Sequence, residues 1–231
     1  MIRLVVFDMA GTTVHDDNVV LRCFVAAAKA VDLRATEEEL NNRMGISKLE
    51  VFDELARRQL GKGPHADALR DAGYRTFREI LEGVYTHTGA TAMRGAEETF
   101  AWLRGRGVRI ALNTGFYREV TDLLVEKLGW KNAVDTVVCV DDVPQGRPAP
   151  YMIHTAMQRC GVAAVGDVAV VGDTPVDMQA GHNSGARLVI GVTSGAHKAT
   201  TLRRQPLTHL LAGVWELPDL LPRVDRLSGT S

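Results

Sequence analysis

Short apolar runs rich in valine, isoleucine and leucine recur along the chain, and each has the length of a buried β-strand. They occupy residues 2–7, 108–112, 134–140, 168–171 and 188–192. Helical patterns lie between the later runs, at residues 96–104, 117–128, 150–160 and 175–184. A strand that is apolar throughout is typical of a sheet covered on both faces. The alternation therefore predicts an α/β fold built on a doubly wound parallel sheet.

One long stretch interrupts this alternation. Between residues 18 and 91 the chain has helical patterns and no strand pattern. Thr36 and Glu39 have the spacing of a capping box at a helix N-terminus. The other helical patterns cover residues 19–31, 49–60 and 66–87. We therefore predict a helical domain at residues 18–91, inserted into a core formed by residues 1–17 and 92–231.

The composition argues against several classes of protein. The formal net charge is -1, which gives no sign of a nucleic-acid partner, and 45% of the residues are hydrophobic, which fits a folded core. The three cysteines form no CxxC pair, and the first apolar run is too short for a signal peptide or a membrane span. We expect a cytoplasmic protein without a membrane partner, and a frayed tail at residues 223–231.

Polar residues follow four of the predicted strands, at the point where each strand ends. These polar segments are residues 8–13, 113–115, 141–148 and 172–177. The carboxyl ends of parallel strands meet at one edge of a sheet, where ligands bind in doubly wound folds. The four segments should therefore gather several carboxylates, hydroxyls and one arginine in a single crevice.

Such a crevice suits phosphoryl transfer, which depends mostly on positioning and on neutralising charge. Asp8 is a candidate carboxylate nucleophile. Mg²⁺ prefers oxygen ligands, so we expect Asp8 and Asp173 to hold it, with the Ala10 carbonyl as a third ligand. Taken alone, an aspartate at a strand end is more often a helix cap or a solvated loop residue. The agreement of four loops favours the catalytic interpretation.

The other polar residues of the crevice are candidates for binding phosphate or for supporting the site. Thr114 and the Gly115 N–H lie before a predicted helix, whose N-terminus favours anions. Arg147 supplies a fixed positive charge, and Thr12 a further hydroxyl. The remaining two candidates, Thr174 and Asp177, have the spacing of a capping box with Pro175 between them. Capping and support of the site are compatible roles.

Together these segments resemble the four motifs of the haloacid dehalogenase superfamily. Within it, the chain is similar to phosphonatase, which is phosphonoacetaldehyde hydrolase, and to its near relatives. The resemblance rests on residues 8–14, 44–48, 114–115, 141–148 and 172–177. It implies a Rossmann-like core, a helical cap domain, a Mg²⁺ cofactor, an aspartyl-phosphate on Asp8 and a substrate contact at Met44. By analogy, it also implies a homodimer built through the cap.

Ala10 separates this chain from the usual phosphatases of the superfamily, which carry a second aspartate at that position. That aspartate acts as the general acid for the leaving oxygen, a contribution of roughly a hundred- to ten-thousand-fold in rate. Alanine cannot transfer a proton. Phosphonatases resemble this chain in having alanine there.

Lys48 matches the lysine that the phosphonatase cap presents to the core. A phosphorus–carbon bond breaks readily when the carbon chain carries an imine that accepts the electrons, and a lysine amine forms that imine from an aldehyde. Such a lysine needs a lowered pKa. The alternative for Lys48 is a solvated cap lysine without a catalytic role.

Three positions depart from the phosphonatase pattern. The chain has Asn18, Val51 and Phe116 where that pattern carries cysteine, histidine and tyrosine. The predicted activity is thus cleavage of a small aldehyde phosphonate, either phosphonoacetaldehyde or a relative. Two alternatives stay open: a phosphatase for a small phosphorylated metabolite, and a non-catalytic binding protein on the same scaffold.

Overall fold

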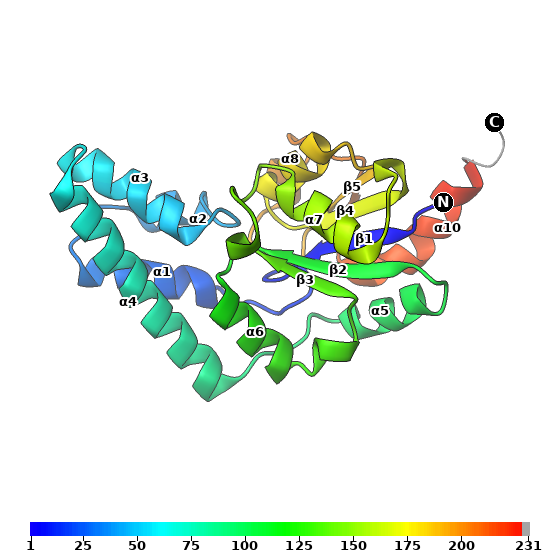
Figure 1. Ribbon diagram of the computed structural model, residues 1–231, viewed down its shortest axis with the longest axis horizontal. Helices are drawn as coiled ribbons and strands as arrows, with labels where there is room; N and C mark the ends of the chain where they lie inside the picture. The colour runs from blue at the N-terminus through cyan, green and yellow to red at the C-terminus, as the bar shows by residue number, and fades with distance from the viewer. Residues whose placement is uncertain (228–231) are drawn as a thin grey trace.

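The computed structural model describes residues 1–227 and is built around a parallel sheet (Figure 1). The strand order is β3-β2-β1-β4-β5-β6, and every neighbouring pair is parallel. The strands are β1 (Leu4–Asp8), β2 (Arg109–Thr114), β3 (Thr136–Cys139), β4 (Val168–Gly172), β5 (Leu188–Val192) and β6 (His209–Leu211). This order confirms the predicted fold class. It also adds β6, which the apolar pattern does not predict.

Alternate residues of the central strand pack on opposite faces of the sheet. Val5 and Phe7 belong to one core, where Phe7 meets Phe100 edge to face at 5.5 Å between ring centroids. Leu4 and Val6 belong to the other core. All five residues of β1 are buried. Burial on both faces explains why the strand is apolar without alternation.

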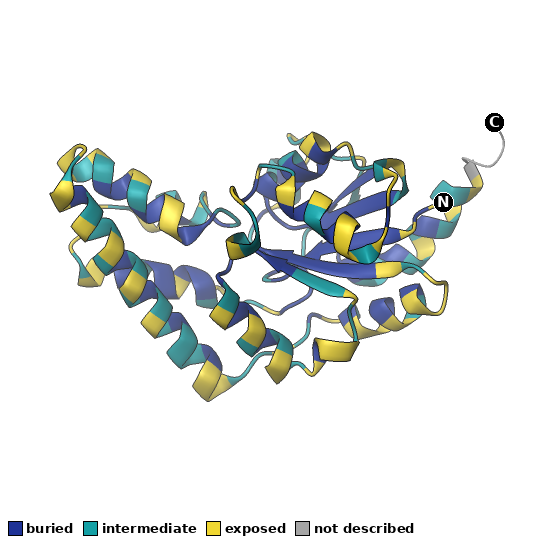
Figure 2. Ribbon diagram, in the orientation of Figure 1, coloured by how far each residue is buried: buried dark blue, intermediate teal, exposed yellow. Residues whose placement is uncertain are grey.

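Helices cover both faces of this sheet (Figure 1). On one face lie α7 (Tyr151–Cys160) and α8 (Pro175–Ser184), which pack on the strands and on each other. On the other lie α5 (Ala96–Arg104), α6 (Arg118–Lys127) and α10 (Leu217–Leu227). The short helix α9 (Ala199–Leu202) packs beside α8. In Figure 2 the strands are mostly dark blue, and the outer sides of these helices are yellow.

The C-terminal prediction is wrong in part. Residues 223–227, expected to be frayed, form the end of α10, whose Leu217 and Leu221 are buried. The last residues of the predicted tail, 228–231, lie outside the described part of the chain. Within residues 1–227, we find no helix that combines the length and the apolar character needed to cross a membrane.

The stretch between β1 and α5 forms four helices, which we call the helical insertion. They are α1 (Val19–Ala30), α2 (Glu37–Asn41), α3 (Lys48–Leu60) and α4 (Pro64–Thr88). The predicted capping box of Thr36 and Glu39 is present at the start of α2. The insertion extends beyond one end of the sheet (Figure 1). The boundaries of the inserted domain stay a prediction.

Three phenylalanines from different helices form the centre of the insertion. The Phe24 ring packs edge to face on Phe52 and on Phe77, with centroid distances of 5.0 and 5.8 Å. All three side chains are fully buried. Because α1, α3 and α4 each contribute one ring, this cluster holds the helices that carry the polar residues described below.

We expect Phe77→Ala to lower the free energy of unfolding by about 3–5 kcal/mol, because it removes a buried ring and leaves a cavity. Urea unfolding followed by circular dichroism measures this change. Leu60→Ala is the matched control, since Leu60 is a hydrophobic residue of α3 that is 50% exposed. Its effect should stay within about 0.5 kcal/mol. Equal losses in the two variants would contradict a buried aromatic centre.

Candidate active site

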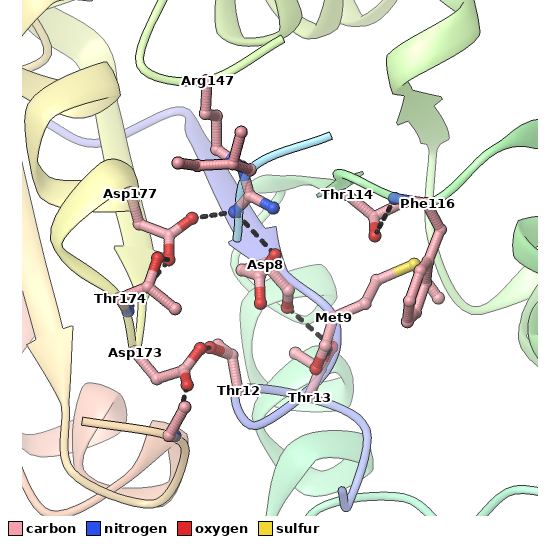
Figure 3. Close-up of polar contacts among 12 residues, drawn as sticks. Asp8, Met9, Thr12, Thr13, Thr114, Phe116, Arg147, Asp173, Thr174 and Asp177 are labelled. Atoms are coloured by element: carbon pink, nitrogen blue, oxygen red, sulfur yellow. Dashed lines mark hydrogen bonds and ion pairs between the residues drawn. The ribbon is translucent and has the colours of Figure 1, made fainter. Parts of the chain in front are cut away.

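The ends of β1 and β4 lie side by side at the centre of the sheet. Phe7 pairs with Val171 in register, so Asp8 and Asp173, one and two residues further on, emerge from neighbouring strands. The order of the strands reverses its direction at this point, and ligands bind at such switch points in doubly wound sheets. Figure 3 shows that the side chains of both aspartates lie in the same small space.

Arg147 connects Asp8 to Asp177 through a buried pair of ion contacts (Figure 3). One guanidinium nitrogen, Nη1, donates to Asp8 Oδ1 at 2.6 Å and also to Asp177 Oδ1. The Arg147 side chain is only 2% exposed. Its Nε atom is also buried and has no hydrogen-bond partner among residues 1–227. The Nε–H of this guanidinium is therefore available to an acceptor that enters the site.

Asp177 performs the predicted capping role and also faces the centre of the site. Its Oδ2 accepts hydrogen bonds from the Thr174 backbone N–H at 3.0 Å and from the Thr174 hydroxyl at 2.5 Å. Gly172 leaves room for this carboxylate, because a Cβ added there would lie 2.4 Å from the Asp177 Cβ. Capping α8 thus fixes the carboxylate that Arg147 contacts.

Asp173 is surrounded by donors and by two glycines. Thr12 Oγ1 donates to its Oδ1 at 3.1 Å, and the Ala196 N–H donates to its Oδ2 at 2.7 Å. Added Cβ atoms at Gly11 and Gly195 would lie 2.6 and 2.0 Å from Oδ2. Burial, and then the charge of Asp8, raises the pKa of Asp173 to about 7.

Two features of the residues around Asp173 differ from the expectations drawn from the sequence. Thr12, proposed there to bind phosphate, directs its hydroxyl to Asp173. The segment Ser194 to Ala196, which follows β5, is a further loop of the site that is not among the predicted segments: the Ser194 hydroxyl donates to the Gly11 carbonyl at 2.9 Å. The rule that polar residues follow strand ends would have found it, because Thr193, Ser194 and Gly195 directly follow the fifth apolar run.

Three carboxylates are close enough to hold one metal ion. Oxygen atoms of Asp8, Asp173 and Asp177 lie within 4.8 Å of one another. Three carboxylates against the single Arg147 guanidinium leave two formal negative charges in a buried space. A divalent cation with a preference for oxygen fits this donor set and this charge. Asp8, Asp173 and the Ala10 carbonyl are the ligands expected from the sequence, so the additional carboxylate is Asp177.

Thr114 and Gly115 lie on the opposite side of Asp8, at the end of β2. The Thr114 hydroxyl accepts a hydrogen bond from the Phe116 N–H at 3.1 Å, which turns the chain before α6 (Figure 3). Gly115 packs against the insertion, because an added Cβ would lie 2.9 Å from the Gly45 carbonyl oxygen. The insertion therefore touches the core next to the site.

The loop before α3 brings the insertion over the strand ends. At Gly45, where φ is +86°, an added Cβ would lie 2.6 Å from Thr174 Oγ1. Met44 is buried and lines the cavity. Lys48, the first residue of α3, is 6% exposed, and its Nζ donates to the Ile46 carbonyl at 3.2 Å and lies 5.4 Å from the centre of the Phe24 ring. Burial, and then the Arg147 charge, lowers the pKa of Lys48 to about 8.

A cavity of about 230 Å³ joins the core residues to those of the insertion. Among the residues predicted from the sequence, those that line it are Asp8, Ala10, Met44, Lys48, Thr114, Gly115, Arg147, Asp173 and Thr174. Thr12 and Asp177 contact these residues from behind. The structure thus brings the predicted set together around one space, whose lining includes the buried amine of Lys48 and the carboxylates of Asp8 and Asp173.

Comparison with known proteins gives consistent results. A sequence profile described as haloacid dehalogenase-like hydrolase matches residues 2–185. Phosphonoacetaldehyde hydrolase of Bacillus cereus strain AH187 is 33% identical over 208 residues, which cover 84% of this chain and 77% of the relative.

Two solved structures share the fold at lower identity. A phosphonoacetaldehyde hydrolase-like protein from Oleispira antarctica has a TM-score of 0.83 at 19% identity, and the match covers all of this chain and 95% of that one. A predicted phosphoglycolate phosphatase from Haemophilus somnus has a TM-score of 0.76 at 17% identity, and the match covers 95% and 97%.

We expect one lysine of the folded protein to titrate near pH 8, because Lys48 loses solvation in the cavity and lies near Arg147. Reductive methylation with ¹³C-formaldehyde followed by NMR titration measures this value, whereas an ordinary lysine titrates at about 10.4. The early-titrating signal should be missing from Lys48→Arg. A spectrum in which every lysine of the wild type titrates above pH 10 would rule out the lowered pKa.

Proposed function

The chain belongs to the haloacid dehalogenase-like hydrolases, in the branch that resembles phosphonoacetaldehyde hydrolase, and from this premise we propose that it cleaves the phosphorus–carbon bond of a small aldehyde phosphonate. The main support is the position of Lys48. A buried amine with a pKa lowered to about 8 lines the same cavity as Asp8. At neutral pH, a useful fraction of such an amine is uncharged and able to attack an aldehyde.

The reaction begins at Lys48. Its amine attacks the aldehyde carbon, and loss of water forms an iminium bond to the substrate. The phosphoryl group lies toward Arg147, whose buried Nε has no partner within residues 1–227 and can donate to a phosphoryl oxygen. Thr114 and the Gly115 N–H line the same end of the cavity and can bind further oxygens.

Asp8 then attacks phosphorus. A bond forms between its carboxylate oxygen and phosphorus, the carbon–phosphorus bond breaks, and the released electron pair moves to the iminium nitrogen. The product on Lys48 is a neutral enamine, whose carbon takes a proton from water. Water hydrolyses the iminium ion and, separately, the acyl phosphate on Asp8. Arg147 holds one oxygen of Asp8, so the direction of attack is set before substrate binds.

Mg²⁺ is the cofactor we propose for the carboxylate cluster. Asp8 and Asp173, with Asp177 or the Ala10 carbonyl, would hold it, and it would supply positive charge for the phosphoryl oxygens. The two uncompensated negative charges of the cluster and the raised pKa of Asp173 support a divalent cation there.

A phosphatase for a small phosphorylated metabolite is the second candidate function. It is supported by Phe116 and Val51, which are buried apolar residues where the phosphonatase pattern carries tyrosine and histidine. It would use Asp8, Asp173 and Arg147 in the same way. Ala10 counts against it, because an alkoxide leaving group would receive no proton from that position.

Lys48→Ala should lower phosphate release from phosphonoacetaldehyde by at least about a hundred-fold, the low end of the contribution of a positioned catalytic group. Borohydride added together with phosphonoacetaldehyde should inactivate the wild type, because it reduces the iminium bond and leaves the lysine alkylated. Mass spectrometry of peptides locates the modification.

Lys62→Ala is the control for this experiment, since Lys62 is an exposed lysine of the same insertion. It should retain full activity and be inactivated like the wild type. Undiminished phosphate release by Lys48→Ala would refute the imine. Release of phosphate from phosphomonoesters alone, without sensitivity to borohydride, would establish the phosphatase instead.

Mg²⁺ should stabilise the wild type against thermal unfolding, since a ligand at about a hundred times its dissociation constant adds about 2.7 kcal/mol to folding. Asp173→Asn should remove most of this stabilisation. Asp122→Asn, which changes a carboxylate of α6 whose side chain is 63% exposed, should retain it. Equal stabilisation by Mg²⁺ in all three proteins would exclude a metal site at the carboxylate cluster.

A further inference from the structure

Asp16 is an acidic residue of the cavity that the proposed reaction does not yet use. It lies between the loop after β1 and the start of α1, and it lines the same cavity as Lys48. Its side chain is half-buried. Asp16 Oδ1 accepts a hydrogen bond from the Val20 N–H, in the first turn of α1, at 3.1 Å. This bond fixes the carboxylate on the insertion side of the cavity.

The titratable groups around Asp16 come from three helices. Arg22 and Cys23 belong to α1, Lys48 to α3 and Tyr85 to α4. Among the groups that act on Lys48, Asp16 opposes the lowering of the lysine pKa more strongly than Asp8 does. Burial raises the pKa of Asp16 above its ordinary value. The two charged groups therefore share the cavity and influence each other, and Asp16 holds a proton more readily than a solvated aspartate.

Imine chemistry at Lys48 needs a group that both gives and takes a proton. A hydroxyl must leave the first adduct of amine and aldehyde as water, and later a water molecule must attack the iminium carbon. Ala10 carries no acid, and Val51 and Phe116 are apolar. The two other titratable residues of this segment, His15 and Asp17, are exposed and pair with each other at 3.3 Å. Asp16 is the half-buried carboxyl of this segment that can transfer the proton.

We propose that Asp16 is the proton-transfer residue for the Lys48 imine; the inference rests on the proposed function. Protonated Asp16 gives its proton to the departing hydroxyl: the carbon–oxygen bond breaks, water leaves and the carbon–nitrogen double bond forms. Asp16 is then a carboxylate beside the iminium cation. After the carbon–phosphorus bond has broken and the enamine carbon has been protonated by water, Asp16 takes a proton from the attacking water. That step forms the new carbon–oxygen bond and restores the acid.

Capping of α1 is the structural alternative for Asp16, and one substitution separates the two roles. Asparagine keeps a side-chain oxygen for the Val20 N–H and caps helices as well as aspartate does, but it cannot transfer a proton. Asp16→Asn should therefore unfold at nearly the wild-type temperature while losing imine chemistry. Asp16→Glu keeps a carboxyl and should recover part of the lost rate.

The test uses acetaldehyde with cyanoborohydride, because reductive trapping of this aldehyde on Lys48 requires no phosphorus chemistry. We expect Asp16→Asn to slow trapping and phosphate release on the order of a hundred-fold. We also expect it to remove the fall in trapping rate that the wild type shows as the pH rises and Asp16 loses its proton. Asp17→Asn is the matched control, since it removes the adjacent charge from a carboxylate that is 79% exposed. It should trap within about twofold of the wild type.

Each outcome decides between the alternatives. Wild-type trapping rates in a folded Asp16→Asn variant would overturn the role of Asp16 and leave the proposed function standing. A wild type that is trapped by neither acetaldehyde nor phosphonoacetaldehyde would overturn both. If Asp16→Asn does not fold, Asp16→Ser, which can also cap a helix, replaces it under the same criteria.

Discussion

The buried contact of Arg147 with Asp8 and Asp177 is the interaction on which the rest of the site depends. It joins three segments that are far apart in the sequence: the end of β1, the loop after β3 and the start of α8. Removing one partner of a buried ion pair leaves an uncompensated charge, at a cost of about 3–5 kcal/mol. The loops therefore hold one another in position. The same guanidinium also contributes to the lowered pKa of Lys48. A charge of the core therefore favours the neutral form of an amine that the insertion contributes.

Placement of the insertion is the second constraint, because the properties of Lys48 depend on where α3 begins. Its lowered pKa comes first from burial, and that burial exists while Gly45 packs against Gly115 and Thr174. Movement of the insertion away from the core would let water reach the amine and restore an ordinary pKa. A movement that closed the insertion over substrate would therefore also activate the lysine, as lids complete the site in other enzymes.

The parallel sheet and most of the site could be predicted from the sequence, because strands buried on both faces leave continuous apolar runs whose ends carry polar residues. Asp8, Asp173 and Arg147 were found in this way. The short strand β6 was missed because its three residues are only half-buried. The end of α10 is hard to predict from the sequence, since Pro222 interrupts the helical pattern. Asp16 has no local signal: it lies in a loop before α1, and its proposed role depends on Lys48, which is the first residue of α3.

Ala10 and Lys48 both fit a reaction in which the group that leaves phosphorus is a carbon atom. An oxygen leaving group needs a proton, and a carbon leaving group of this kind needs an acceptor for electrons. The chain lacks an acid at Ala10 on the core side of the cavity and has a buried amine on the insertion side. If the amine accepts the electrons, the group that leaves phosphorus no longer needs a proton. Proton transfer is then needed where the imine forms and where it is hydrolysed. Asp16, a carboxyl that lines the same cavity as Lys48, would carry out this transfer.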